Sequence, residues 1–232
     1  YRISGSAIRW LLPLTVTFLL LGLVWGLLVA PPDFKQGNSY RIIYVHVPSA
    51  VVALAGYYVM ALAGAVSLIW RIKMADLTMR AAAPVGAVLT AIALATGAIW
   101  GKPTWGTWWV WDARITSMLI LLFLYLGVMA LFESFENKTA AAKACAVLSL
   151  IGTVNIPIIY KSVDWWYSLH QPASIKFTGE TSIDSSMLYP LLIMIIAFYL
   201  LFAVTVLLNM RAEVIWSHRN SSWLRGEHGE VS

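Results

Sequence analysis

The sequence has few charged residues and a single cysteine. Charged side chains make up 12% of the 232 residues, about half the share of an average soluble protein, whereas 60% are hydrophobic. So much apolar surface excludes a disordered chain and exceeds what a soluble core of this size can bury. Cys145 has no partner cysteine and no C-x-x-C motif, which excludes a disulfide scaffold and dithiol chemistry within the chain. The composition indicates an integral membrane protein.

Six long apolar segments account for this composition. Each approaches or exceeds the length of about 20 residues that a helix needs to cross a bilayer, and none contains Asp, Glu, Lys, Arg or His. The predicted spans are residues 10–30, 48–70, 81–100, 115–132, 144–160 and 187–210. We expect an all-α fold with one membrane domain over residues 1–210 and a tail over 211–232. At the end of the third span, Gly97 and Gly101 have a spacing that favours close helix approach.

The basic residues are unevenly distributed around these spans. Ten lie before the first span and after the second, fourth and sixth, and six lie in the other three connecting segments. Because positive charge favours the cytoplasmic side, we expect both termini in the cytoplasm and residues 31–47, 101–114 and 161–186 outside. The net charge of +5 therefore reflects membrane topology and does not indicate a nucleic-acid partner.

One of these outer segments is rich in tryptophan. Residues 100–116 read WGKPTWGTWWVWDARIT and hold five tryptophans within twelve residues. An aromatic belt at the membrane surface explains one or two tryptophans at a boundary, as it does for Trp100. Five are more than anchoring requires, so the segment predicts a binding surface. The candidate residues of that surface are Trp105, Trp108, Trp109, Trp111, Asp112 and Arg114.

A short surface helix over residues 104–113 would bring several of these side chains together. Residues at i, i+3, i+4 and i+7 share one helix face, and here they are Trp105, Trp108, Trp109 and Asp112. Trp111 would point elsewhere, and Arg114 would lie at the edge. A broad indole surface suits a large, flat, aromatic ligand better than a sugar or an ion.

Two histidines lie in the outer segments: His46 just before the second span and His170 after the fifth. We expect both outside the hydrocarbon, with a second short surface helix near His170. Each alone is typical of a hydrogen-bonded interfacial side chain. Together they match a metal held in a flat macrocycle, which needs only two axial ligands, often imidazoles. A bare zinc ion needs three or four ligands, and no third histidine or thiolate lies nearby, so the pattern favours haem.

These segments resemble those of a known family. WGKPTWGTWWVWDARIT resembles the tryptophan-rich WWD segment of membrane haem-handling proteins. NSYRIIYVHVPSA and DWWYSLHQ resemble the two histidine regions of the CcmC family of bacterial cytochrome c maturation. The resemblance extends from about Gly37 to His170, with Ile115 where leucine is expected. The 173–186 loop and the tail match no motif.

The resemblance implies a bacterial inner-membrane protein with six spans, cytoplasmic termini and a haem site at the periplasmic face. The cargo would be haem b, loaded onto a membrane-anchored, CcmE-like haem chaperone. Further partners would be CcmA-like ATPase and CcmB-like membrane subunits of an ABC-type complex, and a small single-span CcmD-like protein. ATP hydrolysis would occur in a partner, and this chain would not be an enzyme.

The resemblance also implies residue roles. His46 and His170 would ligate the iron, and the platform for haem and chaperone would consist of Trp105, Trp108, Trp109, Trp111 and Asp112. Basic residues would neutralise the haem propionates; the candidates are Arg41, Arg114 and Lys161.

Two other functions stay open at this stage. The first is a permease that itself moves haem or another substrate across the bilayer. Spans without ionisable residues argue against ion or proton coupling, and the chain has no nucleotide-binding motif. The second is an electron-transfer cytochrome with quinone chemistry. Such cytochromes usually hold their haem ligands within spanning helices, whereas both histidines are expected outside them.

Overall fold

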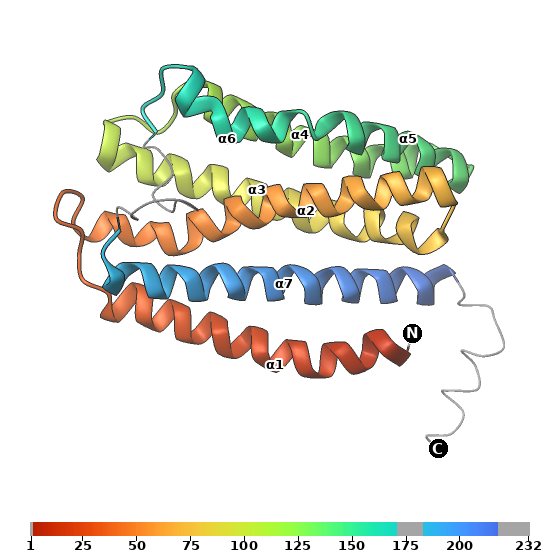
Figure 1. Cartoon of the computed structure of the whole chain (residues 1–232), viewed down its shortest axis with the longest axis horizontal. Helices are drawn as coiled ribbons and strands as arrows, with labels where there is room; N and C mark the ends of the chain where they lie inside the picture. The colour runs from red at the N-terminus through yellow and green to blue at the C-terminus, as the bar shows by residue number, and fades with distance from the viewer. Residues whose placement is uncertain (1, 171–182, 218–232) are drawn as a thin grey trace.

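The computed structural model describes residues 2–170 and 183–217, which form helices joined by short connections (Figure 1). The helices are α1 (Arg2–Val24), α2 (Ile43–Trp70), α3 (Lys73–Trp105), α4 (Ala113–Ser134), α5 (Lys138–Gly152), α6 (Asn155–Trp165) and α7 (Ser185–Ser217). A π-helical segment, Trp25–Val29, continues α1, and a 3-10 segment, Asn38–Ile42, precedes α2. Six helical stretches are long and apolar enough to cross a membrane. This confirms the expected all-α fold with six spans.

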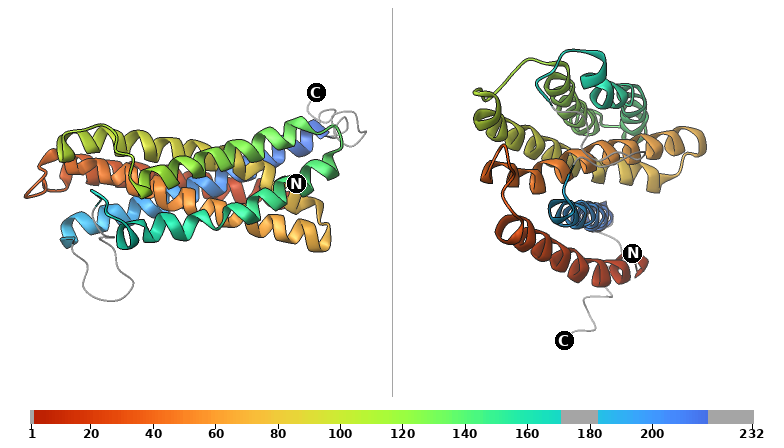
Figure 2. Two further views of the ribbon diagram at one scale, coloured as in Figure 1. Left: turned by 90° about the horizontal axis from the view of Figure 1, so that it is seen from above. Right: turned by 60° about the vertical axis from the view of Figure 1, so that its left-hand side comes forward.

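The helices stack in layers (Figures 1 and 2). Helix α1 packs on α7, and α7 packs on the α2–α3 pair. On the other side of that pair, α3 contacts α4 and α2 contacts α5, while α6 packs mainly on α4. The described residues of the three segments that the sequence assigns to the outer side, 31–47, 101–114, 161–170 and 183–186, all lie at the left-hand end of the bundle in Figure 1.

A buried tyrosine joins the middle layers. Tyr125 of α4 is fully buried, and its hydroxyl donates to the Ala53 carbonyl of α2 at 2.7 Å. Its ring meets the edge of the Tyr57 ring at 5.1 Å between centroids. Gly86 of α3 leaves room for this ring, because a Cβ there would lie 2.1 Å from Tyr125 Cζ. A missing side chain therefore allows α3 and α4 to approach each other.

Ion pairs connect three helices at the opposite end of the bundle. The Arg80 guanidinium of α3 lies 2.8 Å from a Glu133 oxygen of α4 and 2.8 Å from a Glu213 oxygen of α7. The basic residue that the sequence places between two spans thus links neighbouring helices at that end.

The fifth span is broken into α5 and α6. The chain turns at Thr153 and Val154, and Asn155 begins the second half. The Asn155 amide donates to the Ser117 carbonyl of α4 at 2.8 Å. The most polar side chain of this span therefore attaches α6 to α4, where an unbonded amide would be costly.

The two expected surface helices do not form. Helix α3 continues through residue 100 to Trp105 and ends at Gly106, whose φ of +80° suits glycine. Residues 106–112 are not helical. Asp112 then caps the N-terminus of α4, accepting from the Ile115 N–H at 2.8 Å. Because α3 ends before Gly106 and α4 begins after Asp112, no separate helix forms over residues 104–113.

The second expected surface helix is absent for a tertiary reason. Helix α6 ends at Trp165, and Trp166 is extended, with φ −132° and ψ 156°. The side chains that follow bond to Asp112 of another segment instead of continuing the helix. The expected tail over residues 211–232 is helical in its first part, because α7 continues to Ser217. The rest of that tail lies outside the described residues.

Candidate functional site

His46 lies in the first two turns of α2, within the stretch Asn38–Trp70 that can span a membrane. Helix α2 begins at Ile43, five residues before the predicted start of the span at Pro48, so His46 lies in the helix and not in the loop before it. The imidazole is partly buried against α3. Its Nδ1 lies 3.0 Å from the Ala93 carbonyl oxygen and 3.1 Å from Thr96 Oγ1.

These contacts define the tautomer of His46. A carbonyl oxygen can only accept a hydrogen bond, so His46 Nδ1 must carry a hydrogen and donate it to the Ala93 carbonyl. The Thr96 hydroxyl already donates to the Ile92 carbonyl at 2.6 Å and can therefore accept as well. With its hydrogen on Nδ1, the ring has its lone pair on Nε2, which is the atom available to a metal.

Two neighbours on α3 hold the His46 ring in place. Trp100 packs edge-on against it at 5.7 Å between centroids. The Trp100 indole N–H donates to Gln36 Oε1 at 2.7 Å, which anchors it to the loop before α2. On another side, a Cβ at Gly97 would lie 3.0 Å from His46 Cε1. The small residue predicted to favour close helix approach thus makes room for the imidazole.

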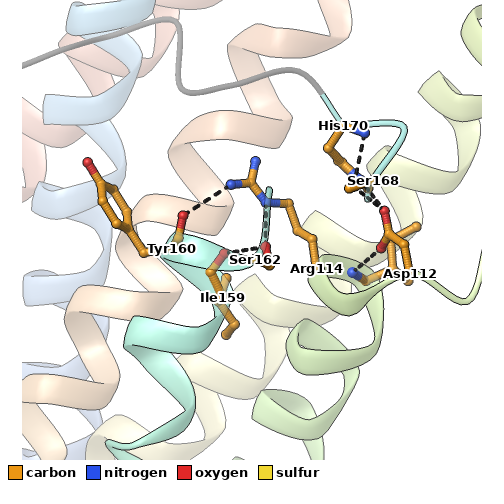
Figure 3. Close-up of polar contacts among 8 residues, drawn as sticks. Asp112, Arg114, Ile159, Tyr160, Ser162, Ser168 and His170 are labelled. Carbon is orange, nitrogen blue, oxygen red and sulfur yellow. Dashed lines mark hydrogen bonds and ion pairs between the residues drawn. The ribbon is translucent and has the colours of Figure 1, made fainter. Parts of the chain in front are cut away.

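His170 is held by Asp112 (Figure 3). His170 Nδ1 lies 2.9 Å from Asp112 Oδ2, and the Ser168 hydroxyl donates to the same oxygen. The His170 backbone N–H donates to Ser168 Oγ at 3.1 Å. Burial lowers the pKa of His170, and the Asp112 carboxylate offsets only part of this effect. A neutral ring with its hydrogen on Nδ1 again has its lone pair on Nε2.

Asp112 stays ionised in this arrangement. Burial raises the pKa of its carboxyl, but hydrogen bonds from the Ile115 N–H, Ser168 and His170 bring the net pKa below its ordinary value. Asp112 is only 9% exposed, and its two oxygens are divided between the α4 N-terminus and the Ser168–His170 segment. It therefore acts here as a bridge between two segments.

The tryptophans do not share one face. Trp105 of α3 packs edge-on against His170 at 4.6 Å, and Gly101 makes room for its ring. Trp109 and Trp111 form a separate edge-to-face pair at 5.4 Å. Trp108 and Trp111 are 57% and 74% exposed. The predicted shared helix face is therefore absent. Of these four tryptophans, Trp105 contacts the His170 imidazole, and the other three lie in the non-helical segment 106–112.

The basic candidates already have hydrogen-bond partners. The Arg41 guanidinium donates to the Leu27 and Ala30 carbonyls, which close the end of the first span. Arg114 donates to Ser162 Oγ at 3.3 Å and to the Tyr160 carbonyl at 3.4 Å (Figure 3). Lys161 pairs with Asp164 at 3.0 Å.

The structure brings the two histidines into one neighbourhood. Both contact the last turns of α3, His46 through Trp100 and His170 through Trp105. The Arg114 guanidinium lies within electrostatic range of both imidazoles, and His170 lies within that range of His46. Within residues 2–170 and 183–217, neither Nε2 atom has a hydrogen-bond partner.

Sequence reasoning missed several residues of this site. Ala93 and Thr96 look like ordinary span residues, and Gln36 lies in a loop without a motif. Ser168 stands two residues before His170, which is the one local signal that could have indicated a supporting hydroxyl. Asp112 was expected in the ligand platform, and its bond to His170 depends on tertiary structure.

Comparisons with known proteins relate this chain to one family. A family model, CcmC: Heme exporter protein C, matches residues 1–225. A curated relative from Escherichia coli (strain K12), named heme exporter protein C, is 49% identical over 224 residues, covering 97% of this chain and 90% of the relative. A relative of that name from Haemophilus influenzae is 47% identical over 97% of this chain and 92% of its own length. One from Bradyrhizobium diazoefficiens is 47% identical over 92% and 81%, respectively. The chain therefore belongs to the CcmC family.

Proposed function

We propose that this protein binds haem between His46 and His170 and presents it for transfer during cytochrome c maturation. One observation carries the proposal: two imidazoles from distant parts of the chain lie at one end of the bundle. Each is held through Nδ1, with Nε2 left unbonded among the described residues. The printed name of the relatives, heme exporter protein C, supports haem as the cargo.

The residues present fit a haem better than a bare metal ion. In the part of the chain that the structure describes, no group of three or more His, Cys, Asp or Glu side chains is placed to hold a metal. Two imidazoles suffice when a porphyrin fills the other positions around iron. Trp100 and Trp105 add aromatic edges next to the imidazoles. These features support a porphyrin as the ligand.

Arg114 is the favoured partner for the haem propionates. Its guanidinium lies within electrostatic range of both imidazoles, whereas the Arg41 guanidinium is used to close the end of the first span. A guanidinium can pair with carboxylates in a bidentate geometry. The exposed rings of Trp108 and Trp111, the second packed against Trp109, then form the part of the platform open to a partner.

The setting is a membrane complex. The distribution of basic residues supports cytoplasmic termini and a periplasmic haem site in the bacterial inner membrane. The haem is b-type cargo, passed to a CcmE-like chaperone. The complex includes CcmA-like and CcmB-like subunits, of which the first hydrolyses ATP, and a CcmD-like single-span protein.

Absorption spectroscopy of the purified protein tests the ligand assignment. The parent is expected to show low-spin haem bands, and the His46→Ala, His170→Ala double variant is expected to lose them because both axial ligands are gone. The matched control is the His218→Ala, His228→Ala double variant, which removes two imidazoles from the tail, where no motif is found. Retention of the low-spin bands by the His46, His170 double variant would refute the proposal.

A further inference from the structure

The side chain that holds His170 differs chemically from the group that holds His46. His46 Nδ1 faces a neutral backbone carbonyl, that of Ala93, at 3.0 Å. His170 Nδ1 faces the Asp112 carboxylate at 2.9 Å. Hydrogen bonds to an ionised acceptor are roughly twice as strong as neutral ones. The two imidazoles are thus supported unequally, and the stronger support comes from a residue that the sequence places in the tryptophan-rich segment.

The Asp112 carboxylate is itself fixed. One oxygen accepts the Ile115 N–H at 2.8 Å, in the first turn of α4, and the other accepts from Ser168 and His170. Rotation of the carboxylate would break contacts on both sides at once. Trp105 closes another side of the imidazole, with ring centroids 4.6 Å apart. The direction of His170 is therefore set by α3, by α4 and by its own loop.

We infer that Asp112 is a positioning residue for His170: it holds the ring in the Nδ1–H tautomer and directs Nε2 toward the iron. This inference rests on the proposed haem function. In metal sites, a carboxylate on the far nitrogen of a histidine orients the ring and makes it a stronger donor. The Ser168 hydroxyl contacts the same Asp112 oxygen and His170 Nδ1, so Ser168 helps to position the ring. Asp112 then acts through His170 and need not contact haem or a partner.

The first test is Asp112→Asn, which keeps the size of the side chain and an oxygen that can cap α4. Haem affinity is expected to fall by about ten- to a hundredfold. The midpoint potential of the bound haem is expected to rise, because the ligand loses its anionic partner. The matched control is Asp184→Asn: Asp184 accepts the Ser186 N–H at 2.8 Å near the start of α7, is exposed and bonds to no histidine in the described residues. Parent-like affinity and potential in Asp112→Asn would overturn the inference.

A double-mutant cycle separates positioning from direct contact. If Asp112 acts through His170, adding Asp112→Asn to His170→Ala causes no further loss of haem affinity. A further loss of the full single-variant size would overturn the inference, because Asp112 would then act on haem independently. Ser168→Ala is expected to shift the potential in the same direction as Asp112→Asn, by a smaller amount.

The two proposals can fail separately. If the parent has low-spin haem that His170→Ala abolishes, while Asp112→Asn has no effect, only the positioning role is wrong. If the parent never shows axial imidazole ligation, the proposed function itself is wrong. A thermal unfolding midpoint near that of the parent confirms that Asp112→Asn is folded.

Discussion

Gly86→Ala is expected to destabilise the protein by about 3 kcal/mol, near the upper end of the usual range for overpacking a core. The added Cβ would lie 2.1 Å from Cζ of Tyr125 and 2.5 Å from its hydroxyl oxygen. Tyr125 is fully buried and tied to the Ala53 carbonyl, so its ring cannot move aside without losing that hydrogen bond. The measurement is the thermal midpoint and the yield of monodisperse protein in detergent.

Gly127→Ala is the matched control for this substitution. Position 127 lies in α4, and a Cβ there would meet only the flexible end of Leu148, at 3.2 Å. Both substitutions replace glycine in a helix by alanine, which favours the helix by up to about 1 kcal/mol, so their difference isolates the clash. Tyr125→Leu in the Gly86→Ala background is expected to recover part of the loss. Equal stability of the two alanine variants would contradict the expectation.

Gly97→Leu is expected to remove the low-spin haem signal while the protein stays folded. A Cβ at this position would lie 3.0 Å from His46 Cε1 and 4.0 Å from Nε2, and the leucine branches would extend further. The imidazole would have to turn away from the position in which Ala93 and Thr96 hold it. This expectation follows from the proposed ligand role of His46, and the haem spectrum measures it.

The control for Gly97→Leu is Ala95→Leu. Ala95 lies on the same helix, two residues earlier, and its side chain is exposed on the bundle. Ala95→Leu is expected to retain both the haem bands and the thermal midpoint. If Gly97→Leu kept the full low-spin spectrum, His46 would not need the space that this glycine leaves. A Gly97→Ala variant is expected to lie between the parent and Gly97→Leu.

The six spans could be predicted from the sequence because a bilayer imposes a minimum length on each apolar helix. The ends of the helices could not, since they depend on individual polar contacts. Helix α3 extends beyond Pro103 to Trp105, and α4 begins where Asp112 can cap it. The break between α5 and α6 lies in a stretch without charged residues whose average hydropathy still satisfies a membrane span, so the average alone gives no sign of the break.

The candidate site was predictable only in part. His46 and His170 could be selected because they are the two histidines outside the tail and occur beside aromatic residues. Helical spacing suggested a shared face for the tryptophans, but Gly106 ends the helix that this requires. The bond between Asp112 and His170 joins residues 58 positions apart, and the contact of His46 with Ala93 spans 47 positions. Local patterns carry no information about such pairs.

The two imidazoles receive their polar support from different helices. His46 is attached to α2 and α3. His170 is attached through Asp112 to the start of α4, and α6, which leads to His170, is fastened to the same helix by Asn155 and Arg114. A displacement of α4 relative to the α2–α3 pair would therefore carry α6, Asp112 and His170 together. Such a displacement would change the distance between the two imidazoles and the contact of His170 with Trp105 of α3, while each ring kept its own polar contacts.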